Sequence, residues 1–264
     1  MKLVSFEGGF GRIEGDSVVP MGQDLLAYIG GARPVEGQPR ALSGLRLLAP
    51  VTKPEKIVCV GLNYRDHAAE SGQPVPEAPV LFAKYRNSLV GPGGSIRLPR
   101  AAPEHVDYEA ELAVVIGRSA SRVPVSRALE YVAGYTCAND VSARDLQSRG
   151  GQWVHGKAID SFLPLGPWLV TPDEIGDPQR LRIRCTINGE VLQDSNTKQM
   201  VFGVSQLISF ISQTITLSPG DLIITGTPPG VGAARKPPRF LRAGDEVTVA
   251  IEGIGDLTNP VEVE

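Results

Sequence analysis

The stretch Asp107-Tyr-Glu-Ala-Glu-Leu-Ala-Val-Val-Ile-Gly117 decides the fold of this chain. From Glu109 onward it is typical of a mostly buried strand, because a run of aliphatic residues follows the two acidic ones. Residues two apart in a strand point to the same face, with Cα atoms roughly 6.5–7 Å apart, so Glu109 and Glu111 are neighbours. Like charges against a hydrophobic sheet repel each other and are costly to desolvate unless a cation lies between them.

A third carboxylate, Asp140, follows the apolar, strand-like stretch 131–137 and precedes a polar turn. A ligand set made only of oxygens suits a hard divalent ion such as Mg²⁺ or Mn²⁺ better than zinc. The alternative is that Glu109 and Glu111 line a solvated edge strand and that Asp140 only caps a helix. The three residues alone leave both interpretations open.

Length and composition predict a soluble, enzyme-like protein. The 264 residues suffice for one large domain, or a large one plus a small one. The net charge of −3 gives no electrostatic reason to expect nucleic acid or an anionic membrane as a partner. No apolar run approaches the roughly 18 residues that span a bilayer, and the N-terminus lacks a signal-peptide pattern, so we expect a cytoplasmic location.

The three cysteines, Cys59, Cys137 and Cys185, each lie in an apolar or strand-like stretch. Their number is odd and there is no CxxC pair, which argues against a disulfide framework and against a zinc site. We interpret them as buried thiols on strands.

The chain is predicted to have two parts, a small β-rich domain over residues 1–52 and a catalytic domain over residues 53–264. The first part contains hairpin turns at Gly-Gly and Gly-Asp pairs and a short helix from Asp24, and the proline-bearing stretch 49–55 is a rigid connector.

The second part is predicted to be mainly β with few helices, an α+β class with a closed or sandwich-like sheet arrangement. Strands are expected near 56–61, 80–84 and 109–117, and helices over 124–132 and 204–212. Asn188-Gly189 is the strongest turn signal and predicts a hairpin over 181–193.

Histidine is scarce in this chain, so each one can be considered as a catalytic group. His67 and Glu70 are three residues apart, which on a helix places both side chains on one face within hydrogen-bonding reach. A carboxylate that holds an imidazole keeps it basic and oriented, as a general base requires. The alternative is a routine surface pair, while His105 and His155 are interpreted as solvated loop residues.

Three further residues are candidates for substrate contacts. Lys157 follows a glycine-rich loop and could neutralise an enolate or bind a carboxylate, or could be a solvated loop lysine. Arg144 and Gln147 lie four and seven residues after Asp140, so a helix that begins at Asp140 would place all three on one face. Arg144 could instead pair with surface carboxylates such as Asp145.

The loop Thr225-Gly-Thr-Pro-Pro-Gly-Val-Gly232 follows a predicted strand. Its glycines leave backbone N–H groups free and its threonines supply hydroxyls, which suits a carboxylate or an oxyanion. It lacks the Gly-Lys-Ser/Thr ending of a P-loop, which argues against nucleotide binding. A structural turn is the alternative.

Taken together and in this order, these motifs resemble the short bacterial members of the fumarylacetoacetate hydrolase family. The similarity spans roughly residues 56–262. The matching stretches are Val60-Gly-Leu-Asn-Tyr-Arg-Asp-His-Ala-Ala-Glu70, Asp107–Gly117, Gly134-Tyr-Thr-Cys-Ala-Asn-Asp-Val-Ser-Ala-Arg-Asp-Leu-Gln147, Gly156-Lys157, Asp194-Ser-Asn-Thr-Lys-Gln-Met-Val-Phe202 and Gly226-Thr-Pro-Pro-Gly-Val-Gly232.

The resemblance implies a mixed β-sandwich roll, usually a homodimer, with one divalent metal, either Mg²⁺ or Mn²⁺, and with Ca²⁺ as a substitute in crystals. It implies the following roles: metal ligands Glu109, Glu111 and Asp140; a water-activating lid pair His67 and Glu70; a catalytic Lys157; and substrate contacts from Arg65, Asp66, Arg144, Gln147 and Thr227. Ala158-Ile159 stands where the family commonly has Ser-Phe, so a different pocket wall is expected.

We therefore expect a metal-dependent enzyme that acts on 2-oxo or 2-hydroxy-enoic acids through an enolate at C3. Three outcomes share that intermediate: C–C hydrolysis of an acylpyruvate, decarboxylation as with oxaloacetate, and isomerisation of 2-hydroxyhepta-2,4-diene-1,7-dioate. The pair His67–Glu70 favours a reaction that uses water. The rivals are a non-haem iron oxygenase built on His105 or His155 and a non-catalytic module that binds small molecules.

Overall fold

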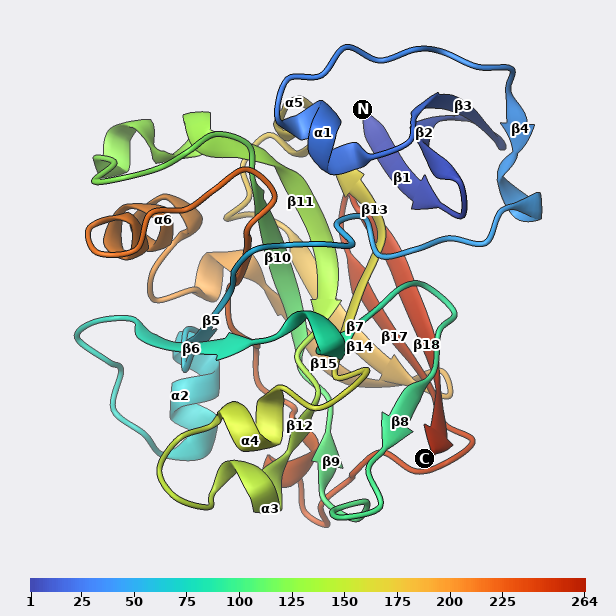
Figure 1. Ribbon diagram of the computed structural model, residues 1–264. Coiled ribbons are helices and arrows are strands. Elements are labelled where there is room, and N and C mark those ends of the chain that lie inside the picture. Colours follow the sequence, from blue (N-terminus) through green and yellow to red (C-terminus); the bar gives the residue numbers. More distant parts are fainter.

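The computed structural model describes all 264 residues, and the chain is mostly β with few helices, as predicted. A large sheet has the strand order β4-β3-β2-β1-β13-β11-β10-β16-β5-β6, with β7 beside β13. A second sheet has the order β15-β14-β17-β18-β8, and β12 pairs with β9. Figure 1 shows β10 and β11 at the centre of the molecule.

The strands of the large sheet are β1 (Lys2–Phe6), β2 (Gly9–Glu14), β3 (Ser17–Gly22), β4 (Arg40–Ala41), β5 (Ile57–Gly61), β6 (Val80–Lys84), β7 (Leu89–Val90), β10 (Ala110–Ile116), β11 (Val132–Asn139), β13 (Leu163–Val170) and β16 (Leu222–Ile224). The remaining strands are β8 (Ile96–Leu98), β9 (Val106–Asp107), β12 (Ser142–Ala143), β14 (Arg182–Ile187), β15 (Glu190–Asn196), β17 (Glu246–Ile251) and β18 (Gly255–Val263).

The α-helices are α1 (Leu25–Ile29), α2 (Arg65–Ser71), α3 (Arg144–Gln147), α4 (Val154–Lys157), α5 (Pro172–Ile175) and α6 (Val204–Ser212). The 3₁₀ helices are η1 (Leu42–Gly44), η2 (Arg86–Ser88), η3 (Val125–Tyr131), η4 (Thr197–Gln199) and η5 (Gly232–Ala234). No helix is long and apolar enough to cross a bilayer.

Strand β10 is buried on both faces because it divides two hydrophobic cores. Leu112, Val114 and Ile116 belong to the main core, which also contains residues of the second sheet such as Ile183 and Val249. The alternate residues Ala113 and Val115 belong to a second core on the other face, with Leu165 of β13. The aliphatic run predicted as a buried strand therefore serves two cores with alternate side chains.

The first strand of the chain joins the large sheet directly. Leu3 of β1 pairs antiparallel with Leu169 of β13, and the side chains of Leu3 and Phe10 enter the second core. Figure 1 shows β1–β4 at the end of the molecule away from α2, α3 and α4. The division of the chain at residues 52 and 53 stays a prediction.

Several local predictions are confirmed. The amphipathic helix over 204–212 is α6 with the same bounds, and Asp24 caps α1 by accepting a hydrogen bond from the backbone N–H of Leu26. Asn188 and Gly189 join β14 to β15 and both have positive φ, as a tight hairpin turn requires. The three cysteines are buried and lie on strands.

Two local predictions need correction. The helix expected over 124–132 is the 3₁₀ helix η3, with its exposed residues Val125 and Leu129 on the outside. No helix begins at Asp140: Ser142 and Ala143 pair with β9 instead, and the helix α3 starts only at Arg144. Pairing with a distant strand competes successfully with helix formation at this point.

Candidate active site

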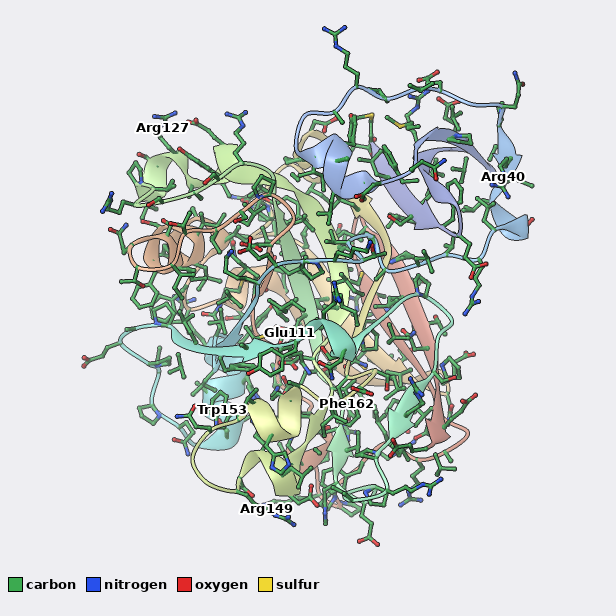
Figure 2. All side chains as sticks on the ribbon, viewed as in Figure 1. Arg40, Glu111, Arg127, Arg149, Trp153 and Phe162 are labelled. Carbon is green, nitrogen blue, oxygen red and sulfur yellow. The ribbon has the colours of Figure 1, made fainter.

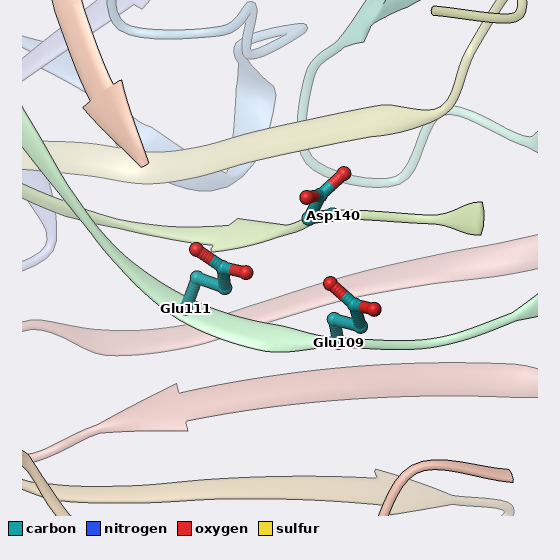
Figure 3. Close-up of side chains that lie close together, drawn as sticks. All are labelled: Glu109, Glu111 and Asp140. Atoms are coloured by element: carbon teal, nitrogen blue, oxygen red, sulfur yellow. The ribbon is translucent and has the colours of Figure 1, made fainter. Parts of the chain in front are cut away.

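The three predicted carboxylates meet at the ends of β10 and β11. Asn139 pairs with Ala110 across the two strands, and the backbone N–H of Asp140 donates to the carbonyl of Glu109 at 2.9 Å. Candidate ligand oxygens of Glu109, Glu111 and Asp140 lie within 4.8 Å of one another, and all three residues are buried. Figure 3 shows the three carboxylates turned toward one another.

This arrangement excludes the solvated-edge alternative. Glu109 is 6% exposed and Glu111 is 1% exposed, so neither lines a solvated edge. Asp140 does not cap the following helix, because the residue at the start of α3 is Ala143. Buried carboxylates placed this close need positive charge beside them.

Two buried lysines supply part of that charge. Lys157, on α4, is 2% exposed, and its Nζ donates to Glu109 Oε2 at 2.7 Å and to Asp140 Oδ2 at 2.8 Å. It is therefore not a solvated loop lysine. Lys84, at the end of β6, places its Nζ 2.8 Å from Asp140 Oδ1.

The pKa values of the two glutamates move in opposite directions. Burial alone would raise the pKa of Glu109, but Lys157 and Arg144 outweigh it and hold that pKa at about 2. Burial, followed by the charges of Asp140 and Glu109, raises the pKa of Glu111 well above its usual value. Glu111 receives one hydrogen bond, from the backbone N–H of Gly226. The site thus holds one carboxylate that lacks a cationic partner.

The same residues fit a divalent cation. The Lys84 ammonium directs its hydrogen bonds to the carbonyls of Val141, Lys157 and Phe162, and Asp140 Oδ1 receives no hydrogen bond although it is buried. Around the site there is one more buried carboxylate than there are cations, counting Asp107, Glu109, Glu111 and Asp140 against Lys84, Lys157 and Arg144. An all-oxygen donor set with this charge suits Mg²⁺ or Mn²⁺.

The predicted histidine–glutamate pair is present on α2. His67 Nδ1 lies 2.9 Å from Glu70 Oε2, which leaves Nε2 as the free ring nitrogen. Glu70 Oε1 accepts a hydrogen bond of 2.8 Å from the backbone N–H of Gly230, so the same carboxylate connects α2 to the glycine-rich loop. His67 lines the cavity described below and is not a routine surface residue.

Arg144 and Gln147 are also brought to the site, although not by the helix expected from Asp140. Arg144 lies 2.8 Å from Asp107 Oδ2 and 2.7 Å from Glu109 Oε1, so it pairs with buried carboxylates and not with Asp145. It also donates to the side-chain oxygen of Gln147, which leaves the amide N–H groups of Gln147 for another acceptor.

Arg65 and Asp66 do not line the cavity. Arg65 donates to the carbonyl of Met200 at 2.6 Å, and Asp66 accepts from the Ser195 hydroxyl at 2.6 Å. These contacts hold α2 against β15 and against the segment that follows it. Their proposed contact with substrate stays a prediction that these positions do not favour.

A cavity of about 400 Å³ opens above the carboxylates. The polar residues that line it are His67, Ser71, Gln73, Glu109, Glu111, Arg144, Gln147, Lys157 and Thr227, and the apolar ones include Val60, Pro76, Val80, Phe82 and Trp153. This size and this division into a polar end and an apolar wall are typical of sites for small ligands.

The apolar wall depends on a glycine. A Cβ atom on Gly61 would overlap the ring of Trp153, with Cη2 only 2.8 Å away, and Trp153 meets Phe82 edge-on at 5.3 Å between ring centroids. Figure 2 places Trp153 beside α4. Ala158 and Ile159 do not line the cavity, and Ile159 packs on the main core, so their expected effect on the pocket wall is not observed.

Sequence reasoning missed Lys84, Asp107 and the aromatic wall. Lys84 ends an apolar strand, where a lysine is expected to reach solvent, and only the tertiary structure brings Asp140 against it. Asp107 opens the stretch that decides the fold, yet its partner Arg144 becomes apparent only when β9 pairs with β12.

Comparison with known proteins agrees with this geometry. The family model described as "Fumarylacetoacetate (FAA) hydrolase C-terminal" matches residues 56–262. The chain belongs to the fumarylacetoacetate hydrolase family. Among relatives of this family, the mitochondrial oxaloacetate tautomerase fahd2 of Xenopus laevis is 53% identical over 221 residues, which is 83% of this chain and 69% of that protein.

Solved structures of the fumarylacetoacetate hydrolase family share the whole fold. A 2-hydroxyhepta-2,4-diene-1,7-dioate isomerase from Mycobacterium marinum has a TM-score of 0.86 at 39% identity, covering 100% of this chain and 99% of that one. A fumarylacetoacetate hydrolase from Exiguobacterium antarcticum has a TM-score of 0.90 at 38% identity, covering 100% of both chains. This chain is therefore an enzyme-type member of the family, with a buried acidic cluster that suits a divalent metal.

Proposed function

We propose that this protein interconverts the keto and enol forms of a small 2-oxo acid of the oxaloacetate class, with Mg²⁺ or Mn²⁺. The observation that carries the proposal is one cavity lined by His67, which Glu70 holds, by the buried Lys157 and by the carboxylates Glu109 and Glu111. The names of the relatives support it, because several proteins at about 53% identity are called oxaloacetate tautomerases.

Glu109, Glu111 and Asp140 would hold the metal. When bound, a divalent ion supplies a Lewis acid that polarises the 2-oxo carbonyl of the substrate. Lys84 contacts Asp140 and Arg144 contacts Glu109, and these contacts keep the two carboxylates oriented.

His67 is the proposed base and acid for the proton at C3. Its Nδ1 faces Glu70, so Nε2 takes the proton from C3 as the C3–H bond breaks, and Glu70 stabilises the imidazolium that forms. The enol is completed when the imidazolium gives this proton, directly or through water, to the 2-oxo oxygen, and formation of the keto form is the reverse. A positioned histidine of this kind typically contributes a factor of about 10²–10⁴ to the rate.

Lys157 stabilises negative charge as it develops on the 2-oxo oxygen. Burial opposes its positive charge, but Asp140 and Glu109 raise its pKa above the usual value, so the side chain is a cation in the folded protein. A fixed cation in a buried site stabilises an oxyanion more strongly than the same cation would in water. Gln147 and Thr227 are placed to bind the substrate carboxylate, and the wall of Phe82 and Trp153 limits water entry.

Isomerisation of a hydroxy-dienoate is the second candidate, and the name of the Mycobacterium marinum structure favours it. It starts from a dienol, which loses its 2-hydroxyl proton to give an enolate of the same kind. The two reactions differ in the carbon that exchanges the proton, C5 of the diene in place of C3. Hydrolysis of an acylpyruvate and decarboxylation of oxaloacetate, which the sequence also allowed, require in addition that a C–C bond breaks.

The homodimer expected from the resemblance is a separate proposal, and its mass in solution can be measured by light scattering.

The decisive experiment follows the enol absorbance of oxaloacetate after the enol is mixed with enzyme. The tautomerase proposal is supported if the enzyme accelerates the loss of enol absorbance, if this acceleration needs Mg²⁺ or Mn²⁺, and if a chelator abolishes it. A parallel assay for pyruvate separates decarboxylation from tautomerisation, and acylpyruvates and hydroxy-dienoates are screened in the same way. Absence of acceleration with every metal and every substrate would refute the proposal.

A further inference from the structure

Gln193, on β15, is a buried amide next to the site, and the mechanism above does not use it. It is 1% exposed and makes three hydrogen bonds. Its Oε1 accepts from the backbone N–H of Ala110 at 2.9 Å, while Nε2 donates to Thr227 Oγ1 and to the carbonyl of Pro228, both at 2.8 Å. The side chain therefore joins the strand segment between the two glutamates to the glycine-rich loop.

The backbone partners fix which way the amide points. A backbone N–H can only donate and a carbonyl can only accept, so Oε1 must face Ala110 and Nε2 must face Pro228. The second hydrogen on Nε2 then points at Thr227 Oγ1, which must accept it. No alternative orientation of this amide satisfies all three partners.

This orientation determines what the hydroxyl of Thr227 can do. A hydroxyl has one hydrogen, and because its oxygen already accepts from Gln193, that hydrogen is donated elsewhere. In the structure it is directed to the carbonyl of Ala110 at a long 3.1 Å, and Thr227 lines the cavity. The hydrogen is thus available to an acceptor in the cavity that is stronger than a neutral carbonyl.

We propose that Gln193 is a positioning residue that makes Thr227 a hydrogen-bond donor to an anionic oxygen of the substrate. The inference rests on the proposed function, since it assumes a carboxylate or enolate oxygen in this cavity. By holding Ala110 and the loop together, Gln193 also fixes the distance from this donor to Glu109 and Glu111. A hydrogen bond from a fixed donor to a charged acceptor is among the stronger ones in proteins.

The test measures binding of oxalate, an unreactive dianion, in the presence of Mg²⁺ by isothermal titration calorimetry. Three variants are compared with the wild type: Gln193→Met, Thr227→Val and the double variant. We expect each single variant to weaken oxalate binding about tenfold or more, and the double variant to be no weaker than Thr227→Val alone. Thr227→Ser, which keeps the hydroxyl, should retain most of the affinity.

Gln179→Met is the matched control. Gln179 also makes hydrogen bonds through both ends of its amide, to Val204, Thr197 and Met200, but it does not line the cavity. The Gln179→Met variant should bind oxalate with the affinity of the wild type. If Gln193→Met does not fold, Gln193→Glu replaces it. Beside the Pro228 carbonyl the buried side chain is held as the neutral acid, and its single hydrogen is donated to that carbonyl, so Thr227 loses the donor that fixes its hydroxyl. Thr227→Val should then add no further loss of oxalate affinity.

The outcomes separate this inference from the proposed function. If Thr227→Val weakens oxalate binding and Gln193→Met does not, Gln193 has no positioning role, while the 2-oxo acid site stands. The inference is also overturned if the binding free energies lost in the two single variants add up in the double variant, because additivity shows that Gln193 acts independently of Thr227. A wild type that does not bind oxalate overturns the proposed function itself. The inference is supported if both single variants weaken oxalate binding to a similar extent and the double variant binds no more weakly than Thr227→Val.

Discussion

Replacing Lys84 by methionine tests whether the buried cations hold the carboxylate cluster together. Lys84 is 2% exposed, and its ammonium contacts the carboxylate of Asp140 and three carbonyl oxygens. Methionine has a similar length and fills most of the space, so Lys84→Met removes the charge and the donors with little change in packing.

The expected loss of stability follows from the Asp140 carboxylate, which stays buried after the ammonium of Lys84 is removed. Removing one partner of a buried ion pair typically costs about 3–5 kcal/mol, because the remaining charge stays buried without compensation. Burial lowers the pKa of Lys84, which shows that its own charge already carries a desolvation cost, and Lys157 remains beside Asp140. We therefore take the lower part of the range, about 3–4 kcal/mol, or a fall in Tm of roughly 6–8 °C at this chain length.

The assay is thermal and urea unfolding of the metal-free protein, followed by circular dichroism. Lys198→Met is the control, because Lys198 is exposed and its substitution should change stability by no more than about 0.5 kcal/mol. A Lys84→Met protein within about 1 kcal/mol of the wild type would show that the lysine does not compensate the buried carboxylates, and the electrostatic account of the site would be wrong.

Four further predictions follow from the same geometry. His67→Gln should slow enol conversion by about 10²–10⁴-fold with little change in Tm, and full activity in a stopped-flow assay would exclude its role as base. Asp140→Ala should abolish the rise in Tm that millimolar Mg²⁺ gives the wild type; unchanged metal content by mass spectrometry and unchanged turnover would disprove the metal site. Gly61→Ala should destabilise the fold by about 1–3 kcal/mol in urea unfolding and raise KM, because the new methyl group displaces Trp153; a wild-type KM would contradict this. Finally, burial and the neighbouring Asp140 and Glu109 raise the pKa of Glu111, so the metal-free folded state keeps a proton that the unfolded chain releases above about pH 4.3. This contribution to stability is lost as pH rises toward the raised pKa, and Mg²⁺ displaces the same proton, so the gain in Tm from Mg²⁺ should be larger at about pH 8 than at about pH 5.5.

Local patterns in the sequence predicted those parts of the site that lie close together in the chain. The spacing of Glu109 and Glu111 placed both on one face of a strand, and the spacing of His67 and Glu70 placed both on one turn of a helix, since each relation depends only on backbone geometry. The Asn188-Gly189 turn was predictable for the same reason.

The remaining features depend on contacts that no local pattern reports. Lys84 and Asp107 acquire their roles from partners on distant strands, and the pairing of β1 with β13 joins the two ends of a long stretch of chain. The prediction of a helix that begins at Asp140 was wrong for a related reason: β12 forms there and pairs with β9. Family resemblance supplied the expected roles of the candidate residues, but it gave no role to Lys84 or Asp107, and Arg65 and Asp66, which it proposed as substrate contacts, do not line the cavity.

The two hydrogen bonds of Glu70 have a consequence for residues outside the cavity. One oxygen holds His67 and the other holds the loop at Gly230, so the orientation of the base depends on the loop as well as on α2. Gly230 does not line the cavity, yet a change in the loop at this position reaches the imidazole through a single carboxylate. The glycine-rich loop therefore serves the site twice, through Thr227 at the cavity and through Gly230 at the support of the base.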